Sequence, residues 1–361
     1  MDVYFIIFVI ICFVGVKIYG PGEFNKDYLS PKSTLPVKGI FVMLVFFTHF
    51  ISYHKLTGEF DSFANWYHAN IKQTIVTMFL FYSGYGVMEA IKNKGKDYVR
   101  KLPLKALKLW IHFVIVVCMF LALKLATGHS YSAEKIIKAF LTTQSIGNSN
   151  WYIGAMLCMY LLTFVAFIFF TFSKKEHRYL PAIILTLLCV GYIFLCVHVR
   201  MSKFWVNTII CYPIGIWYSI FKEKIERIMF KNDIVYWLAL LCAVTPFCIF
   251  YTMKSTMRWY MLSMVFFLFA GIIITMKVNF GNGFLNFLGK HVFSIYILQR
   301  LPFIILDEVG FLEKHPVHSF VISFVATAFM AHVFDILTEK LDDKIFGKKV
   351  AKLPEVKASE K

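Results

Sequence analysis

Lys38 and His49 stand near the two ends of one apolar segment, KGIFVMLVFFTHF, which covers residues 38–50. An imidazole is suited to proton transfer and an ammonium group to binding anions, so the two residue types suggest different chemistry at each end. In a helix, the eleven positions from Lys38 to His49 correspond to roughly 16 Å along the axis and about 20° around it. The sequence therefore predicts that both side chains lie on one stripe of a single helix.

Each of the two residues also has a structural interpretation. A histidine within a membrane helix usually faces the interior of the bundle, where it is either functional or hydrogen-bonded to a neighbouring helix. A lysine at the end of such a helix commonly reaches back to the membrane surface and helps to set the orientation of the chain. Spacing alone leaves both interpretations of His49 open and favours the structural one for Lys38.

The composition predicts a membrane protein. Of the 361 residues, 59% are hydrophobic and only 16% are charged, and long apolar runs recur along the whole chain. The net charge of +17 comes from basic residues in short gaps between these runs, which is a pattern of membrane topology and excludes nucleic acid as the expected partner. The eight cysteines lie in apolar runs without a C-x-x-C pair, so we expect no metal site and no disulfide framework.

The apolar runs predict an all-α, polytopic transmembrane helical bundle of about 10–11 spans. The predicted spans are residues 3–20, 36–53, 74–91, 108–126, 151–172, 179–198, 205–221, 234–252, 258–276, 284–306 and 318–338. The number falls to ten if the first helix lies on the membrane instead of crossing it.

Basic gaps and poorer gaps alternate between these spans, as expected for a multi-pass protein of the inner (plasma) membrane. Placing the basic gaps in the cytoplasm puts the C-terminus inside and, with eleven spans, the N-terminus outside. We expect residues 1–345 to form one integral membrane domain, with 3–20 as an extra N-terminal helix and 36–338 as its core. Residues 346–361 would form a short basic cytoplasmic tail.

Four segments carry a resemblance to a known family. They are the Lys38–His49 segment, FLFYSGYGV from Phe79 to Val87, NSNWYIGAMLCMYLL from Asn148 to Leu162, and LGKHVFSIYILQRLP from Leu288 to Pro302. In this order they resemble the motifs of acyltransferase family 3, whose basic residue and histidine on the first helix are also separated by ten residues. The resemblance covers most of the chain.

The resemblance implies a membrane O-acyltransferase that moves an acyl group, most often acetyl, from cytoplasmic acyl-CoA to a hydroxyl of an extracytoplasmic or lipid-linked glycan. It implies acyl-CoA, with acetyl-CoA the first expectation, as donor substrate and no permanently bound cofactor. The partners would be acyl-CoA, a glycan acceptor and the lipid bilayer. His49 would act as general base or carry the acyl group itself, and Lys38 would meet the phosphates of CoA.

Some residues depart from the family pattern. Lys38 stands where arginine is commoner and so keeps the charge without the bidentate fork. Gln299 stands where many members have histidine, and Met156 and Leu157 stand where one large branch has glutamates. These differences indicate another branch of the family and leave the acceptor open.

Two basic residues in the gap after the third predicted span, Lys92 and Arg100, are further candidates for binding acyl-CoA. Membrane topology alone explains them at least as well. On the span itself, Ser83, Gly84 and Tyr85 belong to the motif of the resemblance. Gly84 and Gly86 would let either a ligand or a neighbouring helix approach closely, and Ser83 lacks the glycine pattern of a nucleophile elbow.

Five more residues are candidates for the motif or acceptor site: Trp151, Tyr152, Lys290, Ser294 and Arg300. Trp151 has an alternative role as an anchor at the membrane interface. Arg300, in the outer half of its span, would bind the acceptor or pair with Asp307.

His332 and Asp335 are spaced to pair with each other as a structural contact. In the outer loop, the rings between Phe60 and His68 would either stack on a sugar or form an interfacial belt.

Two other classes of protein compete with this interpretation. The unrelated membrane-bound O-acyltransferases also use a buried histidine, but the order of motifs here is not theirs. A transporter of a lipid-linked sugar or small solute would be expected to show paired broken segments in two halves, and the sequence shows no such symmetry. Turnover of acyl-CoA by the purified protein would separate both enzyme classes from a transporter.

Overall fold

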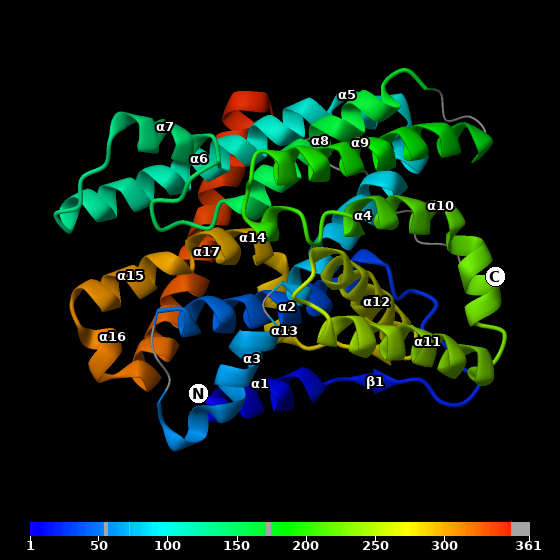
Figure 1. Ribbon diagram of the computed structural model, residues 1–361, viewed down its shortest axis with the longest axis horizontal. Coiled ribbons are helices and arrows are strands. Elements are labelled where there is room, and N and C mark those ends of the chain that lie inside the picture. Colours follow the sequence, from blue (N-terminus) through cyan, green and yellow to red (C-terminus); the bar gives the residue numbers. More distant parts are fainter. Residues whose placement is uncertain (54–56, 72, 171–174, 348–361) are drawn as a thin grey trace.

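A computed structural model describes residues 1–53, 57–71, 73–170 and 175–347, and confirms the prediction of an all-α protein (Figure 1). The α-helices are α1 (Asp2–Phe13), α2 (Pro31–Ile51), α3 (Ser62–Asn70), α4 (Thr74–Lys94), α5 (Lys96–Arg100), α6 (Leu102–Ala126), α7 (Ala133–Phe140), α8 (Trp151–Phe167), α9 (Tyr179–His198), α10 (Cys211–Met229), α11 (Asp233–Thr252), α12 (Met257–Thr275), α13 (Gly283–Lys290), α14 (Val292–Leu298), α15 (Arg300–Glu308), α16 (Phe311–Lys314) and α17 (Pro316–Phe346). Short 3₁₀ turns cover Glu59–Asp61, Lys175–Arg178 and Lys203–Trp205. The strands β1 (Lys17–Ile18) and β2 (Val278–Asn279) pair antiparallel.

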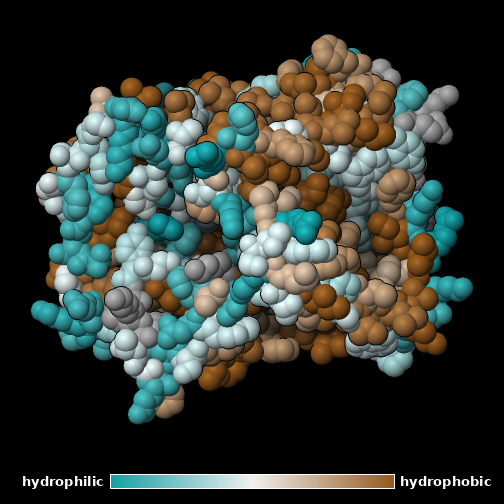
Figure 2. Space-filling view, viewed as in Figure 1, coloured by the Kyte–Doolittle hydropathy of each residue, from teal (hydrophilic) through white to brown (hydrophobic). Residues whose placement is uncertain are grey.

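Within the described residues, seven helical segments are long and apolar enough to cross a membrane: α2, α4, α5 with α6, α9, α11, α12 and α17. Several of them leave their apolar side chains uncovered; on α11, for example, Ile234, Trp237 and Leu241 are exposed. Figure 2 shows brown, hydrophobic surface along the upper edge, where α8 and α9 lie, and at the lower right over α11 and α12. Lipid contact explains so much exposed apolar surface, because a water-soluble protein would bury it. The chain is a polytopic helical membrane protein.

The first predicted span, residues 3–20, differs from the structure. Its helix, α1, ends at Phe13 after 12 residues, which is about 18 Å and too short to cross the hydrocarbon core as a helix. Gly15 has φ +73° and turns the chain out of the helix, and β1 then pairs with β2. A carboxylate at the start of α1, Asp2, accepts hydrogen bonds from the backbone of α3. Helix and extended segment together thus run along the molecule from α3 to β2 (Figure 1).

Three other predicted spans also take a different form. Residues 151–172 form α8, which ends at Phe167 after 17 residues. Residues 205–221 form helix only from Cys211, and α10 continues to Met229. Residues 284–306 form three short helices, α13, α14 and α15, which are separated at His291 and at Gln299. The break residues still take part in backbone bonds: His291 N binds the carbonyl of Phe287, Ile295 N binds that of His291, and Gln299 N binds that of Ile295, so the three helices form one interrupted helical segment.

Hydrogen bonds and ion pairs join loops and helix ends into two groups at opposite ends of the bundle. At the end that carries α7, the bonds are Lys124–Glu308 at 2.7 Å, Lys254–Asn70 at 2.7 Å and Asn207–Gln73 at 2.8 Å. At the end that carries the strands, the bonds are Lys277–Asp233 at 2.5 Å and Tyr28–Tyr218 at 2.7 Å. The gaps that are joined are alternate gaps of the sequence, as a multi-pass topology requires. We call these two ends the α7 end and the strand end.

Glycines let two pairs of helices touch backbone to backbone. A side chain at Gly84 would collide with the Tyr212 carbonyl on α10, and one at Gly215 would collide with the Phe81 carbonyl on α4. In the same way Gly39 lies against Leu285 on α13. These contacts hold α4 against α10 and α2 against α13, and so fix α4 and α2, which line the candidate site.

Candidate active site

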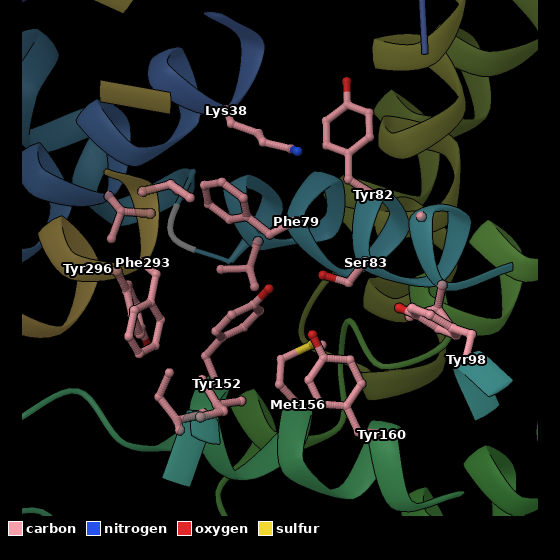
Figure 3. Close-up of a pocket in the computed structure, with 17 residues that line it drawn as sticks. Lys38, Phe79, Tyr82, Ser83, Tyr98, Tyr152, Met156, Tyr160, Phe293 and Tyr296 are labelled. Atoms are coloured by element: carbon pink, nitrogen blue, oxygen red, sulfur yellow. The ribbon is translucent and has the colours of Figure 1, made fainter. Parts of the chain in front are cut away.

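A cavity of about 370 Å³ lies between α2, α4, α8 and α14. We call it the aromatic cavity, because Phe79, Tyr82, Tyr152, Tyr160, Phe293 and Tyr296 line it together with Lys38, Ser83 and several aliphatic residues. In Figure 3, Phe79, Tyr82 and Ser83 come from α4, while Tyr152, Met156 and Tyr160 rise from α8 opposite them. Such an enclosure suits an uncharged chain with a few polar groups.

A second, more polar cavity of about 420 Å³ opens beside the first at the strand end. Lys38, Tyr82 and Gly86 line both cavities, so the two adjoin there. We call the second one the polar vestibule; Lys26 and Lys222 are among the other residues that line it. Together with Lys38 they place three ammonium groups around its walls, which suits a ligand that carries phosphates.

Two carboxylates, Asp27 and Glu89, also line the vestibule, and Glu89 is paired with Lys92 at 2.8 Å. Lys222 lies 3.6 Å from the carboxylate of Glu226, and burial raises the pKa of that carboxyl against the opposing attraction of Lys222. Lys38 has no ion pair among the described residues, and its ammonium lies 5.5 Å from the centre of the Tyr82 ring. Because the ring offers only a cation–π contact, the charge of Lys38 is available to a ligand.

Helix α2 carries both Lys38 and His49 without interruption, as the spacing predicts. Lys38 and Val45 line the aromatic cavity, and His49 follows one turn beyond Val45 toward the α7 end. His49 is half-buried, with its Nδ1 atom closed off from solvent. Its ring centre lies 6.1 Å from that of Tyr296, which lies 5.5 Å from that of Tyr152. Tyr296 thus stands between His49 and the aromatic cavity.

Polar atoms without hydrogen-bond partners gather around His49. Within the described chain, they are Nδ1 of His49, the hydroxyl of Tyr296, Oε1 of Gln299 and Nε of Arg300, and the hydroxyl of Ser149 lies beside Tyr296. A buried polar atom without a partner costs about 1–3 kcal/mol, so several at one place mark a site that is completed by a ligand or by a rearranged contact.

Arg300 was predicted either to bind the acceptor or to pair with Asp307. Among the described residues it forms no ion pair with Asp307. Its guanidinium instead acts on the imidazole of His49 and on the hydroxyl of Tyr53. A cation without a carboxylate partner beside His49 is able to stabilise negative charge that develops there.

The other candidates on α4 and α8 divide between cavity and packing. Ser83 and Tyr152 line the aromatic cavity, where the hydroxyl of Tyr152 points toward Ser83 (Figure 3). Tyr85 lines the polar vestibule. Gly84 packs on α10 and faces neither cavity, whereas Gly86 lines both. Trp151 lies outside the lining, with its ring 5.9 Å from those of Tyr152 and Phe204.

Three of the predicted basic candidates lie away from the two cavities. Lys92 is bonded to Glu89 at 2.8 Å and to the carbonyl of Ser219, so its positive charge is already compensated within the protein. Arg100 is exposed on α5 and lines neither cavity. Lys290 is exposed at the end of α13 and lines neither cavity.

The predicted pairing of His332 with Asp335 is wrong. Asp335 instead pairs with Nδ1 of His291 and accepts a hydrogen bond from Ser294. His332 packs its ring edge-on against His291, with 5.3 Å between the centres. The carboxylate faces His291, which directly precedes α14, and Ser294 on α14, so Ser294 belongs to this contact between helices.

Sequence reasoning did not place Tyr296 and Gln299 beside His49, or Ser149 beside Tyr296. A usable signal was present on α14 and α15. Tyr296, Gln299 and Arg300 are spaced i, i+3 and i+4, so they share one face of a helix that begins in a recognised motif.

Comparison with known families agrees with this arrangement. A family model described as an acyltransferase domain matches residues 37–335, which covers α2 through most of α17. The chain belongs to this family, acyltransferase family 3, and is a membrane acyltransferase. Searches of curated proteins and of solved structures found no match.

Proposed function

We propose that the protein is an O-acyltransferase of the inner (plasma) membrane that uses cytoplasmic acyl-CoA, with acetyl-CoA as the first donor to test. Its acceptor is a hydroxyl of a glycan at the α7 end, which faces away from the cytoplasm. The observation that carries this proposal is the pair of adjoining cavities, which lead from three lysines at the strand end to Tyr296, beside His49.

The two cavities suit the two parts of the donor. The phosphates of CoA bind in the polar vestibule near Lys26, Lys38 and Lys222. The long, uncharged arm of the donor extends through the aromatic cavity and brings the thioester toward Tyr296. Exclusion of water from an aromatic enclosure protects the thioester from hydrolysis.

In the proposed reaction His49 takes the proton of the acceptor hydroxyl while its oxygen attacks the carbonyl carbon of the thioester. The C–S bond breaks, the ester C–O bond forms, and the proton passes to the leaving sulfur of CoA. Arg300 and the hydroxyl of Tyr296 stabilise the negative charge on the carbonyl oxygen in the transition state.

The test compares the O-acyl esters of the host's surface polysaccharides by proton NMR. The strains are a gene deletion complemented with wild type, with His49→Ala, or with His129→Ala, at equal amounts in the membrane. His129 is an exposed histidine near the α7 end and serves as the matched control. We expect one ester signal to disappear in the deletion and in His49→Ala and to persist in His129→Ala.

Two results would contradict the proposal. An ester that is lost on deletion but retained in His49→Ala removes His49 from the reaction. A deletion strain with every ester intact removes the glycan acceptor. Release of CoA from acetyl-CoA by purified protein, in the presence of host polysaccharide, distinguishes an enzyme from a transporter in the second case.

A further inference from the structure

Gln299, between α14 and α15, is the residue whose amide group is best placed to orient His49. Its side chain is fully buried, and its Nε2 donates a hydrogen bond of 3.0 Å to the carbonyl of Tyr296. Because the amide nitrogen is committed to this carbonyl, the amide oxygen is directed to the opposite side. Oε1 is closed off from solvent and has no hydrogen-bond partner of standard geometry among the described residues.

The imidazole of His49 offers the complement to this oxygen. Nδ1 of His49 is also closed off from solvent and lacks such a partner. Its ring lies 6.1 Å from that of Tyr296, the residue whose carbonyl Gln299 binds, so the Gln299 side chain lies near enough to the imidazole to influence it. An amide oxygen only accepts hydrogen bonds, while a neutral imidazole carries its single proton on one nitrogen or the other. If Nδ1 carries the proton, two buried polar atoms that would otherwise be destabilising are satisfied together.

We infer that Gln299 is a positioning residue, which accepts a hydrogen bond from Nδ1–H of His49 and thereby holds the lone pair on Nε2. This inference rests on the proposed function for the use of that lone pair, but the contact itself does not. A histidine that acts as a base commonly has its second nitrogen bonded to an oxygen that fixes the tautomer and the ring orientation. Here a neutral amide takes that place, so it orients the ring without stabilising a charged imidazolium as a carboxylate would.

The other groups near the ring do not compete for this role. Arg300 on α15 and His68 on α3 act on the imidazole electrostatically, and Tyr296 on α14 lies beside the ring. An arginine has only donors, so it cannot accept from Nδ1–H.

The test replaces Gln299 by Glu and by Leu and measures how the reactivity of the His49 imidazole depends on pH. Diethyl pyrocarbonate modifies neutral imidazole, and mass spectrometry of the peptides gives the rate at His49 as a function of pH. We expect Gln299→Glu to move the pH midpoint of modification upward, because a carboxylate stabilises the imidazolium. Gln299→Leu has no such group, so its midpoint stays at or below that of wild type. Exposed His129 in the same samples is the internal control and should not move.

Steady-state kinetics give a second readout. Gln299→Leu should lower kcat by about 10–100-fold with little change in the KM for acetyl-CoA, the range seen when an orienting partner is removed. Gln299→Glu keeps an acceptor oxygen, so it should retain activity at high pH while the acid limb of its profile shifts upward. Gln73→Leu removes a glutamine at the α7 end that bonds Asn207, and it should leave both readouts unchanged.

The outcomes separate this inference from the proposed function. A midpoint at His49 that is the same in wild type and Gln299→Glu overturns the inference, whether or not the protein transfers acyl groups. A shifted midpoint in a protein that never turns over acyl-CoA supports the contact and contradicts the proposed function. Glutamate is close in size to glutamine, so the Gln299→Glu variant still tests the inference if Gln299→Leu does not fold.

Discussion

Tyr296 has a buried hydroxyl that lies near Ser149 but forms no hydrogen bond of standard geometry among the described residues, between His49 and the aromatic cavity. In Tyr296→Phe the ring contacts with His49 and Tyr152 remain and only this hydroxyl is lost. Since an unpaired buried polar group costs about 1–3 kcal/mol, we expect the variant to be at least as stable as wild type. We expect kcat to fall roughly 100-fold if the hydroxyl stabilises the transition state.

The measurements for Tyr296→Phe are the thermal midpoint in detergent and the rate of CoA release. Tyr192→Phe is the control, because it removes another buried hydroxyl from α9, outside the lining of either cavity. Equal rates in Tyr296→Phe and wild type would show that the ring alone matters at this position.

Lys38 allows a second prediction at the scale of the residue. Lys38→Ala removes an ammonium group that lines both cavities, and a hydrogen bond to a charged group contributes about 1.5–3 kcal/mol. We expect the KM for acetyl-CoA to rise by at least tenfold with a smaller change in kcat, as measured by initial rates over donor concentration. Lys94→Ala, an exposed lysine at the same end, should behave as wild type. An unchanged KM in Lys38→Ala would remove this lysine from donor binding.

At the scale of the element, two glycines on α4 should respond in opposite ways. Gly84→Ala forces a methyl group against the backbone of α10, so we expect a loss of about 1–3 kcal/mol of stability and a lower thermal midpoint. Gly86→Ala meets no atom within 4 Å and favours the helix, so the protein should fold at least as well. The new methyl group enters the lining of both cavities, and we expect the KM for acetyl-CoA to change. A Gly84→Ala protein as stable as wild type would argue against the close packing.

The same two glycines show how far an element can be predicted from sequence. The sequence indicates that α4 has small residues at these positions, and it favours neither packing nor ligand for them. Which of the two glycines packs and which faces a cavity depends on the position of α10, which lies more than 120 residues further along the chain. Lys38 and His49 were predictable because one helix carries both. The spacing of Tyr296 and Gln299 shows that they share a face, but not that this face meets His49, because the segments that carry them and Ser149 approach α2 only through tertiary packing.

At the scale of the whole molecule, the all-α bundle and the alternation of its loops follow from composition, since apolar runs and basic gaps repeat along the chain. The form of the individual spans does not follow from composition. Hydropathy detects the apolar run at residues 3–20 but does not register that Gly15 ends the helix and that β1 pairs with the distant strand β2.

The direction of the molecule in the membrane gives a prediction at this scale. Glu134→Cys on α7 and Lys94→Cys at the end of α4 place exposed thiols at the two ends, in a background without native cysteines. We expect a membrane-impermeant maleimide to label Glu134→Cys on intact cells, and Lys94→Cys only after the membrane is opened. The reverse pattern would place the lysines of the vestibule outside the cytoplasm and exclude cytoplasmic acyl-CoA as donor.

The roughly 16 Å of α2 between Lys38 and His49 also has an electrical consequence. In the proposed reaction an acyl group arrives from one end on CoA, and the proton of the acceptor returns toward that end on the CoA sulfur. Separate release and uptake of protons at the two ends would move one elementary charge, at about 2.3 kcal/mol per 100 mV of membrane potential. A proton that His49 hands on to the sulfur moves no net charge. The rate in sealed vesicles should then be the same with and without an imposed potassium diffusion potential, so that surface modification continues in a cell that has lost its membrane potential.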